Sequence, residues 1–145
     1  MSTAVTNVLA VVILAAILAA CGGGSTPLET RATLGPQAFH ALEPDQVAFA
    51  EITVDVDGVL TARADWRLAG NDLDLYVTAP SCAAWNVVDL AARCAVLGRT
   101  TGVTAKPERL AIDVTRGTYR VWVANFGRSV ESGTLEATAA AARDD

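Results

Sequence analysis

The order of apolar and polar side chains divides this chain into segments with different patterns. Every residue from 8 to 20 is apolar. From residue 47 onward, apolar and polar residues alternate in several short stretches, which indicates strands with one buried face. The intervening residues 22–44 show neither a strand nor a helix period and are interrupted by Gly22-Gly23-Gly24, Pro27, Gly35-Pro36 and Pro44. The pattern therefore predicts a hydrophobic leader, a flexible linker and a β-rich domain.

Six strands can be assigned from the alternation, and each ends at a turn signal. They cover residues 49–56, 59–66, 72–77, 110–114, 118–126 and 133–138. Asp57-Gly58, a dipeptide favoured in hairpins, separates the first two. Residues 87–104 leave room for one or two more strands. Short strands at regular spacing predict an all-β fold, a small antiparallel β-sandwich over residues 45–140, with residues 141–145 as a tail.

Composition and charge narrow the classes of partner. A chain of 145 residues allows a single domain. All of its 11 basic and 16 acidic side chains lie after residue 20, so the part beyond the leader carries the whole net charge of −5. Its basic residues are scattered along the sequence. This distribution excludes nucleic acid as a partner, and it provides no polybasic patch for a membrane surface.

The apolar run ends in Leu18-Ala19-Ala20-Cys21, which resembles the lipobox of bacterial lipoproteins. The run is shorter than the roughly 20 residues that span a bilayer, and it has the length of a signal peptide. The resemblance implies that residues 1–20 form a signal helix that is removed, and that Cys21 then carries the lipid that anchors the chain to a membrane. The alternative is an uncleaved membrane helix, because no Lys or Arg precedes the run.

The residue after the lipidated cysteine bears on location. It is Gly22 and not Asp, and in the sorting rule of enterobacterial lipoproteins this implies the outer membrane, with the domain in the periplasm or at the cell surface. Lipidation of Cys21 also accounts for the odd number of cysteines. Cys82 and Cys94 are then left to pair with each other, as expected for a protein in an oxidising compartment.

Three stretches resemble the bacterial pre-peptidase C-terminal domain, a family related to the collagen-binding domains of clostridial collagenases. They are residues 71–77 (NDLDLYV), residues 117–127 (GTYRVWVANFG) and residues 133–137 (GTLEA). The resemblance covers roughly residues 47–138 and implies a jelly-roll-like sandwich. Members of that family usually flank secreted peptidases, so it also implies an accessory module for a peptidase that is encoded separately.

One acidic stretch could bind a metal ion. Asp72 and Asp74 project from the same face of a predicted strand, and with Asn71 they could supply oxygen ligands to Ca²⁺. The family resemblance supports calcium, since some related domains bind it. The simpler interpretation is a solvent-facing strand, because two or three oxygens do not complete a calcium site. No other cofactor is expected.

Aromatic side chains are the candidates for ligand contact. The alternation places Trp66 and Tyr119 on core faces. Trp122 falls on the opposite face of its strand, beside Arg120, and Trp85 lies inside the predicted disulfide loop. Because Trp and Arg are frequent at binding hot spots, Trp85, Trp122 and Arg120 are the predicted contact residues. A packed second apolar layer explains the two tryptophans equally well.

The sequence contains no motif of a known catalytic site. It has neither G-x-S-x-G, HExxH nor C-x-x-C, and its single histidine, His40, falls in the predicted linker. The chain is therefore expected to be a non-enzymatic lipoprotein that presents a binding module at the cell envelope. Its partner would be a polysaccharide, a peptide or an envelope protein. The alternative is a structural or assembly component of an envelope complex that binds no small ligand.

Overall fold

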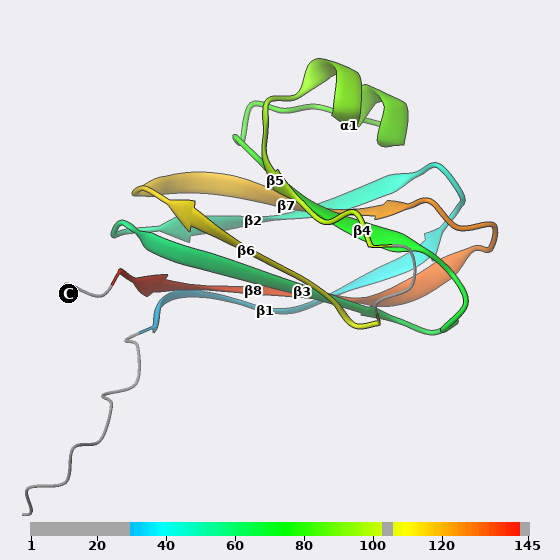
Figure 1. Cartoon of the computed structure of the whole chain (residues 1–145), viewed down its shortest axis with the longest axis horizontal. Coiled ribbons are helices and arrows are strands. Elements are labelled where there is room, and N and C mark those ends of the chain that lie inside the picture. Colours follow the sequence, from blue (N-terminus) through cyan, green and yellow to red (C-terminus); the bar gives the residue numbers. More distant parts are fainter. Residues whose placement is uncertain (1–29, 103–105, 143–145) are drawn as a thin grey trace, which may run out of the picture.

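The computed structural model describes residues 30–102 and 106–142. The predicted signal peptide and Cys21 lie outside these residues. In the described part, eight strands form two four-stranded antiparallel sheets that pack face to face (Figure 1). The strands and the one short helix are β1 (Thr30–Leu42), β2 (Val47–Val54), β3 (Gly58–Trp66), β4 (Leu73–Thr78), α1 (Val87–Arg93), β5 (Val96–Arg99), β6 (Glu108–Val114), β7 (Gly117–Asn125) and β8 (Glu131–Ala141).

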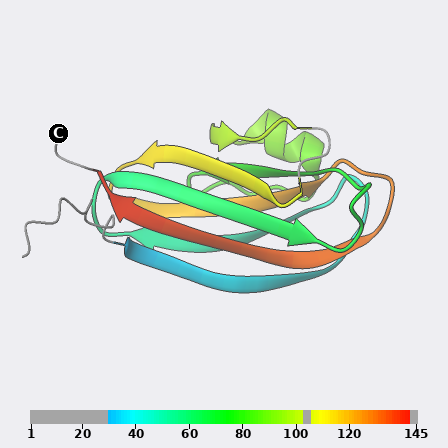
Figure 2. The same ribbon diagram turned by 60° about the horizontal axis from the view of Figure 1, so that its bottom comes forward.

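The order of the strands defines the architecture. One sheet has the order β1-β8-β3-β6 and the other has the order β2-β7-β4-β5. The chain crosses between the sheets at most connections, so that most strands pair with strands that are distant in sequence, whereas β5 pairs with the preceding strand β4 (Figure 2). Eight antiparallel strands divided in this way between two sheets form a jelly roll. The predicted all-β sandwich of jelly-roll type is confirmed.

The main core lies between the two sheets. Every second residue of β3 is buried, from Gly58 to Trp66, while the residues between them are half-buried on the outer face. Trp66 and Tyr119 both belong to this core, as predicted. The strands that cross it contribute mostly Leu, Val and Ala, which pack well from a pleated sheet. The fully buried members include Leu60, Leu73, Leu75, Val77, Val121 and Val123.

The first strand corrects the predicted domain boundary. Residues 30–42 were expected to belong to the linker, but they form β1 and pair with β8 along its length. Phe39 and Leu42 of β1 are buried in the core. The register of β1 shifts between Leu34 and Gln37, which places Gly35-Pro36 in a bulge and interrupts the alternation that identifies a strand. The domain therefore begins at Thr30.

Two further elements differ from the expectation. Residues 87–104 contain one additional strand, β5, as predicted, but they also contain the unexpected helix α1. At the other end, β8 continues to Ala141, one residue into the predicted tail. Within the described residues, no helix has the length and apolarity that crossing a membrane requires.

Candidate functional site

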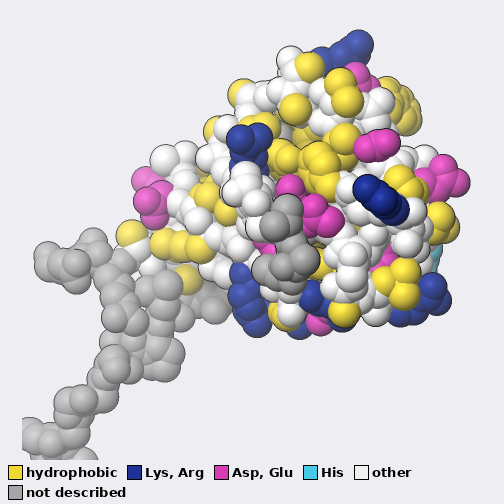
Figure 3. Space-filling model, turned by 45° about the vertical axis from the view of Figure 1, so that its right-hand side comes forward, with side chains coloured by type: hydrophobic (Ala, Val, Ile, Leu, Met, Phe, Trp, Pro, Cys, Tyr) yellow, Lys and Arg dark blue, Asp and Glu magenta, His cyan; other side chains and the backbone are white. Residues whose placement is uncertain are grey.

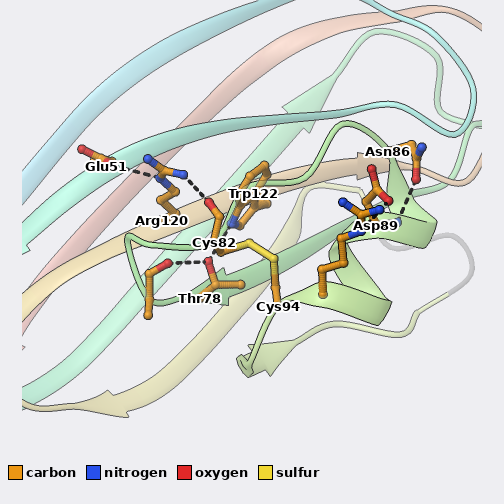
Figure 4. Close-up of a disulfide and its surroundings, with 10 residues drawn as sticks. Glu51, Thr78, Cys82, Asn86, Asp89, Cys94, Arg120 and Trp122 are labelled. Atoms are coloured by element: carbon orange, nitrogen blue, oxygen red, sulfur yellow. Dashed lines mark hydrogen bonds and ion pairs between the residues drawn. A yellow bond between two sulfur atoms is a disulfide. The ribbon is translucent and has the colours of Figure 1, made fainter.

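The outer face of the β2-β7-β4-β5 sheet carries an additional segment, residues 79–95, which includes α1 (Figure 1). A disulfide between Cys82 and Cys94 closes this segment, with a Cα–Cα distance of 5.3 Å, and confirms the predicted pairing. Asn86 caps α1, since its side chain accepts a hydrogen bond of 2.8 Å from the backbone N–H of Asp89 (Figure 4). The segment and the sheet together enclose a second apolar core.

Trp122 lies at the centre of this second core. Its side chain is 1% exposed, and its indole N–H donates a hydrogen bond of 2.9 Å to the hydroxyl of Thr78 (Figure 4). The prediction that Trp122 contacts a ligand is therefore wrong. Residues 79–95 cover the face on which Trp122 stands, so the packed second apolar layer is the correct interpretation. The other buried members of this core are Tyr76, Cys82, Val87, Leu90 and Ala124.

Arg120, the third predicted contact, holds the same segment on the sheet. Its guanidinium donates to Glu51 Oε1 at 2.9 Å and to the backbone carbonyl of Cys82 (Figure 4). It also stacks over the ring of Phe49, 4.4 Å from the ring centre. The side chain is thus engaged on three sides, and its role in the structure is to position the disulfide loop.

Trp85 is the predicted contact residue that faces solvent, with an exposed fraction of 84%. Val88, three residues later on α1, is 70% exposed, and Phe126, just after β7, is 42% exposed. Figure 3 shows apolar side chains gathered at the top of the molecule, where α1 stands on the sheet. Val88, Ala91, Ala92 and Phe126 line one recess, and Trp85 is exposed on the same disulfide-closed segment as Val88. We call these five residues the α1 patch.

The α1 patch includes a shallow recess of about 450 Å³ between the helix and the sheet. Its floor contains Tyr76, whose ring lies roughly parallel to that of Phe126 with 6.4 Å between the ring centres. Arg99 of β5 supplies a cation at the rim. Burial raises the pKa of the Tyr76 hydroxyl above its ordinary value, with a further contribution from the charge of Asp74. The phenol is therefore neutral and can act as a hydrogen-bond donor.

Of the three proposed calcium ligands, Asn71 is engaged in other hydrogen bonds. The side chain of Asn71 donates to Asn125 Oδ1 at 3.3 Å and to the Ser129 carbonyl at 3.1 Å, and its own oxygen accepts from the Ser129 N–H. Asn71 thus fastens the β7–β8 turn. The described residues contain no group of three or more His, Cys, Asp or Glu side chains arranged to hold a metal ion. The calcium prediction therefore rests on Asp72 and Asp74 alone, well short of the six to eight oxygens that Ca²⁺ takes.

Asp74 is nevertheless unusual. Its Oδ1 is buried without a hydrogen-bond partner among the described residues, and the same holds for Oε2 of Glu108. Burial raises the pKa of Asp74 to about 6, and the charges of Asp72 and Glu108 act in the same direction, while Arg99 opposes them. Because its pKa lies near neutrality, the Asp74 carboxyl is protonated at weakly acidic pH and loses its proton as the pH rises to neutral.

His40 stands on β1 and not in a linker. It is exposed and lines a recess of about 170 Å³ between β1 and β2, together with Phe39 and Phe49. The other residues around this recess are Gln, Ala, Val and Leu, so within the described structure no acid or nucleophile accompanies the imidazole there. The arrangement does not assemble a catalytic group around His40.

Sequence reasoning identified Trp85 but missed the rest of the α1 patch. Val88 and Phe126 were not singled out, because α1 was not recognised as a helix. The signal was present: Asn86 followed by Val-Val-Asp-Leu-Ala-Ala-Arg is an N-cap residue before a short amphipathic run. Arg99 became a candidate only when the structure placed β5 beside β4, where it pairs with Tyr76.

Comparison with known proteins assigns no family to this chain. No family model matches the chain, so the lipobox and the pre-peptidase resemblance stay predictions. No curated protein matches it either. Among solved structures, a carbohydrate-binding module (CBM6cm-2) from Cellvibrio mixtus lichenase 5A, in complex with cellotriose, is similar with a TM-score of 0.44 and 5% sequence identity. The match covers 79% of this chain and 88% of that chain.

Proposed function

We propose that this chain is a non-enzymatic binding module held at the cell envelope by a lipid on Cys21, and that the α1 patch contacts an envelope protein. The observation that carries the proposal is the exposure of Trp85 and Val88, at 84% and 70%, on a segment fixed by a disulfide. Exposed apolar side chains gathered on one surface typically mark an interaction site.

The segment that carries the α1 patch is held rigidly on the sheet, which supports a role in binding. The Cys82–Cys94 disulfide, the Asn86 cap and the Arg120 clamp fix the segment before any partner arrives. A surface held in one conformation loses little entropy on binding. Trp85 and Val88 are therefore presented on a rigid base.

The shape of the patch favours a protein over a small ligand. Small molecules are usually enclosed by a pocket that buries most of their surface, whereas the recess beside α1 is shallow and open. Its apolar walls with one cation, Arg99, suit a partner that presents an apolar side chain beside an acidic group. This chemistry supports an envelope protein as the partner, and so includes an assembly role within an envelope complex.

The position of the domain relative to its anchor also bears on the proposal. Residues 22–29 separate Cys21 from the start of β1 at Thr30. The nine Cα–Cα steps from Cys21 to Thr30 span at most about 32 Å when fully extended. A domain anchored through Cys21 would thus work close to the membrane surface, within reach of other membrane-anchored proteins. Gly22 supports the outer membrane as the location.

Crosslinking in intact cells tests the proposed surface. A photoreactive amino acid at position 88 is expected to give one defined protein adduct, whereas the same group at the exposed Asp113 of β6, away from the patch, is not. The substitution Phe126→Ser should weaken the adduct formed from position 88. Leu68→Ser, which alters an exposed apolar side chain outside the patch, should leave it intact. Adducts of equal yield from positions 88 and 113 would remove the support for the α1 patch.

The anchor is tested separately. Cys21→Ser is expected to move the chain from the membrane fraction to the soluble fraction and to abolish labelling by a fatty-acid analogue. If Cys21→Ser leaves the chain in the membrane fraction, the uncleaved membrane helix replaces the lipid anchor in the proposal.

A further inference from the structure

The outer face of the other sheet, β1-β8-β3-β6, lies on the side of the sandwich opposite to the α1 patch (Figure 2). Two rows of polar side chains cross its strands. In the first row, Thr33 of β1, Thr138 of β8 and Thr61 of β3 stand directly opposite one another in the sheet register. Thr33 and Thr138 are exposed and Thr61 is partly exposed. The row therefore presents three hydroxyl groups at the spacing of adjacent strands, about 4.8 Å.

The second row is charged. Glu136 of β8, Arg63 of β3 and Arg109 of β6 stand opposite one another. Arg63 forms ion pairs with Glu136 at 3.2 Å and with Asp65 at 2.8 Å. Lys106 forms a third ion pair, of 3.0 Å, with Asp65. The carboxylates of Asp65 and Glu136 therefore neutralise the positive charges of Arg63 and Lys106.

Arg109 is placed differently. It faces Arg63 directly across the β3–β6 pair, an arrangement of like charges that by itself is unfavourable. Among the described residues Arg109 makes no ion pair, and its side chain is exposed. Asp113 shares this strand and face but lies four residues away, about 13 Å along the strand. The row thus carries one net positive charge on a chain whose net charge is −5.

The bulge in β1 converts these rows into a recess. Gly35 and Pro36, which lie at the register shift between Leu34 and Gln37, border the two rows and line the recess. The resulting recess has a volume of about 220 Å³, and its lining includes Thr61, Arg63, Arg109, Glu136 and Thr138. Gly35 has open space on its side-chain side, with no atom within 4 Å of a Cβ added there. The recess has room for a single sugar ring.

We propose that this recess binds a carboxylated sugar ring of an acidic polysaccharide. Arg109 pairs with the carboxylate of the sugar, because a guanidinium offers two parallel N–H donors to such a group. Thr61 and Thr138 exchange hydrogen bonds with the ring hydroxyls, and Glu136 accepts a further one. This site is separate from the α1 patch and stands whether or not that patch binds a protein.

The guanidinium of Arg109 is also able to bind the phosphate of a lipid headgroup. A membrane surface, however, attracts proteins through several uncompensated basic residues, each contributing about 1 kcal/mol. On this face Asp65 and Glu136 neutralise Arg63 and Lys106, so one positive charge, that of Arg109, is left. A face with a row of hydroxyls and one net cation therefore fits a sugar acid better than a lipid bilayer.

Calorimetric titration of the full lipidated chain in vesicles of phosphatidylcholine, which is zwitterionic and carries no net charge, tests the proposal. A short oligogalacturonate is the probe, and its methyl ester, which keeps the rings but removes the charge, is the matched control. Oligogalacturonate is expected to bind, and the ester to bind at least about tenfold more weakly. Arg109→Gln should weaken binding of the acid by about tenfold or more, because a charge-assisted hydrogen bond is lost. Arg128→Gln, which removes an exposed charge in the β7–β8 turn, should not.

The hydroxyl row is tested with Thr138→Val, which keeps the shape of the side chain and is expected to lower the affinity about threefold to tenfold. Thr134→Val, on the same strand beyond the recess, is its control, and thermal melts of all variants show that they fold. The proposal is overturned if the acid and the ester bind equally, if neither binds, or if Arg109→Gln binds as the wild type does. Binding to phosphatidylglycerol vesicles without binding to oligogalacturonate would identify a membrane-contacting face instead.

Discussion

At the scale of single residues, the carboxyl of Asp74 makes the stability of the domain depend on pH. Burial raises its pKa from 3.8 to about 6, so the folded chain holds this proton more tightly than the unfolded chain. The stabilisation from the bound proton is present below the unfolded pKa and is lost as the pH rises through the folded pKa. Through this group, the free energy of unfolding falls between roughly pH 4 and pH 6.

Asp74→Asn removes the titrating group and keeps its shape. The variant is expected to be more stable than the wild type at about pH 8 by about 1–2 kcal/mol, less than the full pKa shift implies because the carboxyl is partly screened by solvent. Near pH 4 the two should unfold with similar free energies. Urea denaturation at a series of pH values measures this, with Asp113→Asn on exposed β6 as the control. A constant difference between wild type and Asp74→Asn at every pH would contradict the assignment.

Single residues also show where the sequence was informative. The burial of Trp66 followed from alternation, because β3 has one face on the main core and one outer face. Trp122 obeys the same alternation and points outward, yet it is buried, because residues 79–95 cover that outer face. Alternation along a strand reports which face a side chain occupies, but whether another segment covers that face is a tertiary property. The misassignment of Trp122 has this cause.

At the scale of elements, α1 depends on the contacts and the disulfide that fix it to the sheet. A helix of seven residues is far too short to be stable alone in water. It is held by Leu90, which is fully buried, by the Asn86 cap and by the Cys82–Cys94 disulfide just beyond its last residue. None of the residues that form the main core between the sheets belongs to this segment. The helix and the sandwich are therefore expected to respond differently when the disulfide is removed.

Cys82→Ser combined with Cys94→Ser is expected to lower the free energy of unfolding by about 2–4 kcal/mol. Hydrogen exchange should show fast exchange at the α1 amides, while the amides of β3 and β8 stay protected, because their partners are in the sandwich. Crosslinking from position 88 should fall in parallel, since the α1 patch is no longer held in one conformation. If the α1 amides of the double variant remain as protected as those of the wild type, the disulfide is not what holds the segment.

Sequence patterns located six strands within a few residues but failed at two elements for physical reasons. In β1 the bulge at Gly35-Pro36 shifts the register, so Phe39 does not follow the alternation set by Ala32 and Leu34, and a second register shift follows between Phe39 and Leu42. Proline is tolerated there because β1 is an edge strand. The seven residues of α1 make about two helical turns, which is too few to distinguish a helical pattern of apolar residues from a strand pattern. The recess on the outer face of the β1-β8-β3-β6 sheet was missed for a related reason, since it joins residues of four strands that are adjacent only in the jelly roll.

At the scale of the whole molecule, the sandwich has two outer faces with different chemistry. The face that carries residues 79–95 is apolar around α1, whereas the β1-β8-β3-β6 face bears rows of threonines and ion pairs. The two faces are separated by the core, so changes at Val88 and at Arg109 should act independently. A chain of this kind, anchored at Cys21, could hold an envelope protein on one side and an acidic polysaccharide on the other.

The domain begins at Thr30 in the structure, whereas the sequence suggested a start at Asp45. The two boundaries differ by the strand β1, on which the stability of the sandwich depends. β1 pairs with β8 along most of its length. Asn125, which is fully buried, donates a hydrogen bond of 2.9 Å to the carbonyl of Leu42. A chain that begins at Asp45 would lose β1 and expose the edge of β8, which invites aggregation. It would also lose two large core side chains, Phe39 and Leu42.

Each lost core side chain costs about 2–5 kcal/mol, so the two together cost about 4–10 kcal/mol, a large part of the stability of about 5–15 kcal/mol that is typical of a domain. The lost pairing of β1 with β8 adds to this cost. The chain that begins at Asp45 is therefore expected not to fold, whereas a chain that begins at Thr30 should melt close to the temperature of the full chain. Circular dichroism during heating measures both, and size-exclusion chromatography detects aggregates. Cooperative melting of the shorter chain at the same temperature would mean that β1 is dispensable, and that the linker extends to Pro44 as its composition suggested.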